Sequence, residues 1–138
     1  MRSTLAVFVA GAALFVSASV PLAAHHSFAA EFDAAKAVTL QGTVTKLDWM
    51  NPHARFYIDV KDDSGTVTNW ELELGSPNAL MRLGWTRNSL KPGEMVSVEG
   101  SLAKDGSKLA NARKVTLADG RKVFAGSAAD TESKDGKQ

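Results

Sequence analysis

Cysteine is absent from the 138-residue sequence. Without a thiol the chain forms no disulfide, carries no lipoprotein-type lipid anchor and offers no cysteine nucleophile. The sequence also lacks a Gly-x-Ser-x-Gly elbow, a phosphate-binding glycine loop and a His-Glu-x-x-His pair. These absences argue against the common hydrolases, and we expect a protein that is not an enzyme.

An excess of charge of one sign is also missing. Outside residues 1–24, which contain Arg2, the chain has 15 basic and 15 acidic residues. Binding to nucleic acid phosphates requires an excess of clustered Lys and Arg, so we expect no nucleic acid partner.

The longest apolar run, Leu5 to Val20, is shorter than the roughly 20 residues that a membrane span requires. It follows Arg2 and precedes the small residues Ala23 and Ala24, which is typical of a secretory signal peptide. We expect cleavage after Ala24, a periplasmic or secreted mature chain without a membrane span, and an N-terminus at His25. The 114 residues that remain are the size of one domain.

Alternating apolar and polar residues predict strands at about 38–48, 55–61, 68–74, 96–102 and 109–117. In the first strand the apolar residues change phase after Lys46, which indicates a bulge, and Gly42 indicates a tight bend. A turn then leads into residues 122–124. Residues 25–37 read as an arm, extended or with one helical turn, residues 38–125 as the domain, and residues 126–138 as a disordered tail.

A short helix is predicted at 77–83, because Ser76 suits the N-cap, Pro77 the first helical position and Gly84 the C-terminal end. Three strands, a helix and two strands are the order of an OB-fold, a five-stranded Greek-key barrel that is all-β apart from one helix. A small β-sandwich is the alternative, but it leaves the central helix unexplained.

The apolar faces of these elements predict the core, and the opposite face of the third strand places Glu71 and Glu73 in solvent beside lysines. The predicted core consists of Val44, Phe56, Ile58, Val60, Trp70, Leu72, Leu74, Leu80, Val96 and Val98.

The turn between the first two strands concentrates the candidate ligand-binding residues. Asn51-Pro52 forces a change of direction, and His53 follows at once. The candidates are Trp49, Asn51, His53, Arg55 and Tyr57. An OB-fold face with aromatic and polar residues suits an oligosaccharide or another small ligand, although packing alone also accounts for most of the aromatic residues.

Histidine occurs only at positions 25, 26 and 53. A mature chain that begins at His25 presents an α-amine and an imidazole on one residue, and His53 could add a third nitrogen for copper(II), with His26 as a spare. The alternative is a solvated arm that binds no metal.

Several motifs together resemble a family of small exported bacterial proteins of unknown function over about residues 25–125. They are His25-His26-Ser27-Phe28, Gly42-Thr43-Val44, Trp49-Met50-Asn51-Pro52-His53, Trp70, Ser76-Pro77, Gly84-Trp85 and Lys91-Pro92-Gly93. The resemblance implies a periplasmic OB-like domain, and it carries over no catalytic residue. A looser similarity is to periplasmic OB-fold stress proteins.

Three functions therefore remain open from the sequence. The first is a non-enzymatic periplasmic binding or accessory module for a small ligand or a protein partner, and the second is a copper-binding protein. The third, a redox or hydrolytic enzyme, is disfavoured because the usual catalytic residues are absent.

Overall fold

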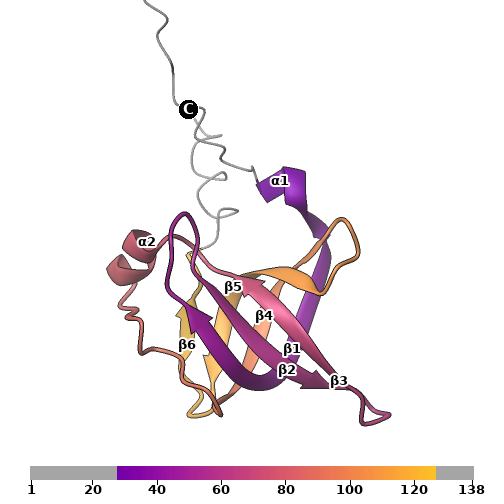
Figure 1. Cartoon of the computed structure of the whole chain (residues 1–138). Helices are drawn as coiled ribbons and strands as arrows, with labels where there is room; N and C mark the ends of the chain where they lie inside the picture. Colours follow the sequence, from indigo (N-terminus) through magenta and orange to yellow (C-terminus); the bar gives the residue numbers. More distant parts are fainter. Residues whose placement is uncertain (1–27, 127–138) are drawn as a thin grey trace, which may run out of the picture.

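The computed structural model describes residues 28–126, which form two short helices and six strands (Figure 1). The elements, in chain order, are α1 Phe28–Glu31, β1 Phe32–Asp48, β2 Arg55–Lys61, β3 Val67–Glu73, α2 Pro77–Arg82, β4 Met95–Ala103, β5 Leu109–Leu117 and β6 Lys122–Phe124.

The strand pairings run in a closed circuit. Strand β1 pairs with β2, β2 with β3, β3 with β5, β5 with β4, and β4 with β1. All of these pairs are antiparallel except β3–β5, and β6 extends the sheet beyond β5. This connectivity, with α2 between β3 and β4 in the chain, is that of an OB-fold. The predicted fold class is therefore confirmed.

Strand β1 is longer than the alternation pattern predicts. It begins at Phe32 rather than near residue 38, and its register against β4 is irregular between Phe32 and Ala37, where the chain departs from regular alternation. The predicted bulge lies between Val44 and Lys46. Gly42 is required for close packing, since a Cβ atom there would lie 2.4 Å from the carbonyl oxygen of Asp59.

The inward faces of the strands form one core, which Leu80 of α2 joins. Eight of the ten predicted core residues are buried; Val60 and Trp70 are half-buried and pack against that core. Their strand phase is correct, and both lie toward the β2–β3 hairpin end of the strands. Burial of this apolar surface is the main favourable contribution to folding.

Helix α2 begins and ends close to the predicted positions. The Oγ of Ser76 accepts a hydrogen bond from the backbone N–H of Ala79 at 3.2 Å, and Pro77 occupies the first helical position. The helix ends at Arg82, and Gly84 follows with a φ of 90°, which glycine adopts without strain.

The predicted signal peptide, His25, His26 and most of the predicted tail lie outside the described residues. Between Phe28 and Gly126, neither helix has the length or the apolar character needed to cross a membrane.

Candidate functional site

A row of polar residues crosses four strands on the outer face of the barrel. The strand registers place Asp48 of β1 opposite Arg55 of β2, Arg55 opposite Glu73 of β3, and Glu73 opposite Asn111 of β5. Side chains alternate between the two faces of a strand, and the neighbours Phe56 and Leu72 point into the core. We call Asp48, Arg55, Glu73 and Asn111 the polar row.

Glu73 is the centre of this row. Its carboxylate lies 3.2 Å from Nδ1 of His53 and 3.7 Å from Nη2 of Arg55, and it accepts a hydrogen bond from Nδ2 of Asn111 at 3.4 Å. The Glu73 side chain is only 5% exposed, whereas that of His53 is 26% exposed. The residue therefore has the partners that a buried carboxylate needs.

Arg55 joins Glu73 to a second carboxylate. Its Nη1 donates to Oε1 of Glu71 at 2.5 Å, and the hydroxyl of Tyr57 lies 3.5 Å from the same oxygen. Lys46 lies 5.3 Å from the centre of the Tyr57 ring and also pairs with Asp48 at 2.9 Å. Tyr57 thus lies among alternating charges on the outer surface.

Burial raises the pKa of Glu73 above its ordinary value of 4.5, and Glu31 raises it further. The neighbouring His53 and Arg55 and the hydrogen bond from Asn111 oppose this rise. Burial and the charge of Glu71 also raise the pKa of Tyr57. The raised pKa of Glu73 shows that the loss of hydration at its carboxylate outweighs the contribution of its partners.

Helix α1 and the β4–β5 loop lie beside the polar row. Phe28 and Phe32 stack with ring centres 5.6 Å apart and form a small apolar cluster with Ala103. Lys104 donates from Nζ to the carbonyl of Ala29 at 2.5 Å and from its backbone N–H to the carbonyl of Glu31 at 2.9 Å. These contacts hold α1 against the barrel.

A pocket of about 370 Å³ opens between these segments. Its lining residues come from α1, from the start of β2 and from the β4–β5 loop, and they are Ala30, Glu31, Arg55, Lys104 and Asp105. Arg55 therefore reaches from the polar row to the wall of a pocket large enough for a small molecule.

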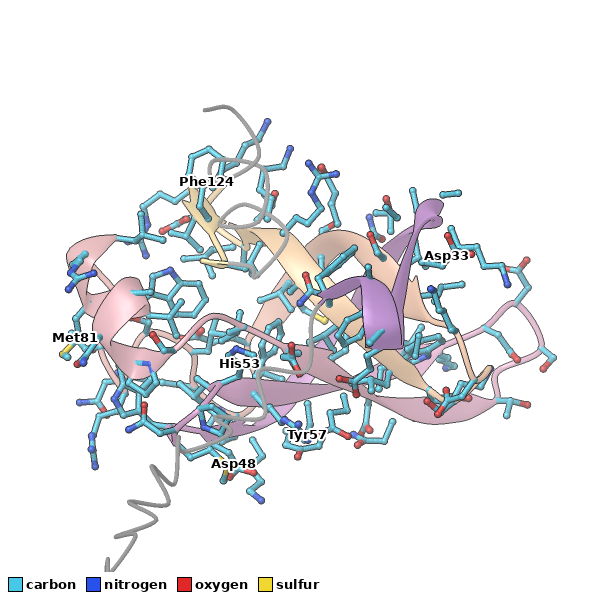
Figure 2. All side chains as sticks on the ribbon, turned by 90° about the horizontal axis from the view of Figure 1, so that it is seen from above. Asp33, Asp48, His53, Tyr57, Met81 and Phe124 are labelled. Atoms are coloured by element: carbon cyan, nitrogen blue, oxygen red, sulfur yellow. The ribbon has the colours of Figure 1, made fainter. Side chains whose placement is uncertain are left out.

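The structure brings together three of the five predicted ligand-binding residues, His53, Arg55 and Tyr57, through their contacts with Glu71 and Glu73. Figure 2 labels His53 and Tyr57. Trp49 is instead half-buried and packs against the core. Asn51 is exposed in the turn, and its peptide bond to Pro52 is cis.

The prediction of a solvated Glu73 is wrong, because Asn111, His53 and Arg55 surround its carboxylate. Asn111, which is fully buried, was not among the predicted site residues. An asparagine within an otherwise apolar strand segment was the one signal that could have pointed to it. Of the three predicted metal ligands only His53 lies in the described part of the chain, which contains no group of three potential metal-binding side chains.

Fold and site together define an OB-fold domain with a charged outer face on β2 and β3. The sequence matches the model of a family of unknown function (DUF6152) over residues 12–112, and the chain belongs to this family. The match confirms the resemblance to a family of unknown function that the sequence motifs indicated.

Among solved structures, the fold is similar to that of Rim1, a mitochondrial single-stranded DNA-binding protein from S. cerevisiae. The TM-score is 0.48 at 12% sequence identity, over 60% of this chain and 93% of that one. No curated protein matches the sequence.

Proposed function

We propose that this protein is a non-enzymatic, exported binding module that takes a small polar ligand on the outer face of β2 and β3. The pocket beside Arg55 is the observation that carries the proposal. OB-folds bind their ligands on the face of the second and third strands, between the loops that join strands one to two and four to five. Arg55 of β2 and residues of the β4–β5 loop line the Arg55 pocket, and the turn that contains His53 leads directly into Arg55.

The charges around the pocket favour a polar and uncharged ligand. Arg55 is paired with Glu71 and Glu73, and Lys104 already donates to a backbone carbonyl. A strongly anionic ligand would have to compete with these internal partners. A molecule with several hydroxyl groups, such as a neutral oligosaccharide, can bind to the exposed edges of these groups without breaking an ion pair.

The test is an NMR titration of the mature protein with chitotetraose. We expect amide shifts confined to residues 30–31, 51–57 and 104–105, and loss of these shifts in Arg55→Ala. Arg87→Ala is the matched control, since Arg87 is exposed in a distant loop. Shifts that survive Arg55→Ala, or no shifts with chitotetraose and with maltotetraose, would contradict the proposal.

Copper(II) binding is the second candidate, and one observation favours it. A histidine that binds a metal through one ring nitrogen commonly donates its other N–H to a carboxylate, which fixes the orientation of the ring. The Glu73 carboxylate lies 3.2 Å from Nδ1 of His53, which leaves Nε2 of this partly exposed ring as the atom that can bind a metal. His25 would supply the other nitrogens.

Copper titration of the mature protein separates the two candidates. The copper proposal expects one copper per chain, lost in His25→Ala and in His53→Ala, and weaker binding at acid pH because protonated nitrogens do not bind metal. Glu73→Gln should weaken binding about tenfold or more through the orientation of His53. Copper binding that is unchanged in His53→Ala would show that the N-terminus acts alone.

A further inference from the structure

A second surface on the barrel combines an exposed aromatic ring with basic side chains. The strand registers place Thr39 of β1 opposite Glu99 of β4, Glu99 opposite Lys114 of β5, and Lys114 opposite Phe124 of β6. Figure 2 shows Phe124 on the side of the domain away from Tyr57. This surface therefore lies apart from the polar row.

Phe124 is exposed, but its backbone is held in place. The ring is 65% exposed, the largest exposed fraction among the large apolar residues between Phe28 and Gly126. Its carbonyl accepts a hydrogen bond from Nε1 of Trp85 at 2.9 Å, and the next residue, Ala125, is buried and donates to the carbonyl of Arg113 at 2.9 Å. The ring is thus presented on a fixed strand and does not contribute to the core.

Three basic residues lie near this ring: Lys114 is opposite Phe124 in the β5–β6 register, Arg113 lines the same hollow, and Lys122 precedes Phe124 by two residues in β6. Arg113 and Lys122 are exposed, and within residues 28–126 neither forms an ion pair. Lys114 pairs with Glu99 at 2.8 Å. The surface therefore has three basic groups and one carboxylate, that of Glu99. We call Arg113, Lys114, Lys122 and Phe124 the Phe124 patch.

A hollow of about 320 Å³ adjoins the patch. Its lining residues are Ala37, Val38, Thr39, Glu99, Gly100, Arg113, Lys114 and Phe124. One carboxylate, that of Glu99, therefore lies beside two basic groups, and it is already paired with Lys114. Gly100 cannot be replaced by a larger residue, because a Cβ atom would lie 2.2 Å from the carbonyl oxygen of Asn111. The volume of the hollow accommodates one sugar ring.

We propose that the Phe124 patch binds an anionic polysaccharide, with a uronic acid residue in the hollow. The apolar face of a sugar ring packs on an aromatic ring, and the planar guanidinium of Arg113 matches a carboxylate with two parallel hydrogen bonds. Lys122 lies two residues before Phe124 in β6, and in this proposal it binds the carboxylate of the next sugar. This binding is independent of the function proposed for the Arg55 pocket.

Charge complementarity favours this ligand over the alternatives. The basic groups follow the strands β5 and β6 as an open surface, which suits a chain of repeated negative charges. The patch has one aromatic ring, that of Phe124, so it offers a ligand one position for stacking. A single-stranded nucleic acid, in contrast, is commonly held on several aromatic side chains.

The test is isothermal titration of the mature protein with hexagalacturonate at low salt. We expect binding that weakens about tenfold in Phe124→Ala and in Arg113→Ala, about threefold in Arg113→Lys, and not at all in the control Arg87→Ala. Binding should weaken as salt concentration rises, because the attraction between exposed charges is screened. Arg55→Ala should leave it unchanged.

Three results would overturn the proposal. The first is equal binding of neutral maltohexaose, which would exclude a role for the carboxylates. The second is binding of hexathymidylate, or of vesicles with 30% phosphatidylglycerol, without binding of hexagalacturonate. The third is no binding of hexagalacturonate by a protein that is folded by circular dichroism.

Discussion

The polar row and the Phe124 patch lie on the outside of the same barrel, yet they use charge in opposite ways. In the polar row the carboxylate of Glu73 is buried among His53, Arg55 and Asn111. In the Phe124 patch, Arg113 and Lys122 extend into solvent without an ion pair in residues 28–126. The polar row occupies its charged groups largely with internal partners, whereas the Phe124 patch leaves Arg113 and Lys122 without one in the described residues. A ligand at Arg55 therefore has to share that group with Glu71 and Glu73, whereas a ligand at the Phe124 patch does not displace an ion pair of Arg113 or Lys122.

The largest loss of stability is expected in the core. Leu72 is fully buried, and Leu72→Ala removes its side chain from a closely packed interior. We expect a loss of about 2 to 5 kcal/mol in the free energy of unfolding. Chemical denaturation monitored by tryptophan fluorescence measures it. A loss below about 1 kcal/mol would mean that the inner face of β3 is packed more loosely than its burial indicates.

The next largest effect should follow Glu73→Ala. The change removes the Glu73 carboxylate from Asn111 and His53 and leaves Arg55 with the Glu71 carboxylate alone. We expect a loss of about 2 to 3 kcal/mol, somewhat below the value for a fully buried pair because Arg55 and His53 are partly exposed. Glu71→Ala is the matched control, two residues away on the same face, with an expected loss of about 1 kcal/mol or less. Equal losses in the two variants would remove the distinction between buried and exposed carboxylates.

The pH dependence of stability sharpens the comparison further. Burial raises the pKa of Glu73 in the folded protein above its ordinary value of 4.5, which applies to the unfolded chain. At a pH between the unfolded and the folded pKa, the folded protein therefore holds a proton on Glu73 that the unfolded chain has released. Stability should therefore fall as pH rises through the raised pKa, and this slope should be smaller in Glu73→Gln. Denaturation at a series of pH values from 4.5 to 7.5 measures it. Parallel slopes for the two proteins would contradict the assignment.

The smallest effects should come from the Phe124 patch. Arg113→Ala and Phe124→Ala each remove an exposed side chain, and we expect the free energy of unfolding to change by no more than about 0.5 kcal/mol. The same denaturation experiment measures this change. A loss above 1 kcal/mol in either variant would place that side chain in the packing of the barrel and weaken its assignment to ligand binding.

The core-facing side chains could be predicted from the sequence, because the alternation of apolar and polar residues in β2 and β3 indicates which side chains point inward. Phe56, Ile58 and Leu72 follow from a period of two residues. The helix at α2 could also be predicted, since the signals for its start and end, Ser76 and Gly84, are local.

The centre of the candidate site could not be predicted in the same way. Glu73 occupies an outward position, and alternation assigns such a position to solvent. Its burial depends on the parallel pairing of β3 with β5, which brings Asn111 to it from 38 residues away, and on α1, which packs nearby through Phe28 and Phe32. No local pattern in β3 contains this information. His53, Arg55 and Tyr57 were identifiable because they lie together in one stretch of chain.

The parallel pairing of β3 and β5 also has a consequence for the order of events in folding. The antiparallel pairs β1–β2 and β2–β3 join neighbouring segments, whereas β3 meets β5 only after the chain has passed through α2 and β4. Pairings between distant segments carry the larger entropic cost and form slowly. Pairing of β3 with β5 is the step that brings Asn111 to the Glu73 carboxylate. Because burial raises the pKa of Glu73, we expect the pH dependence of the refolding rate to report the burial of this carboxylate.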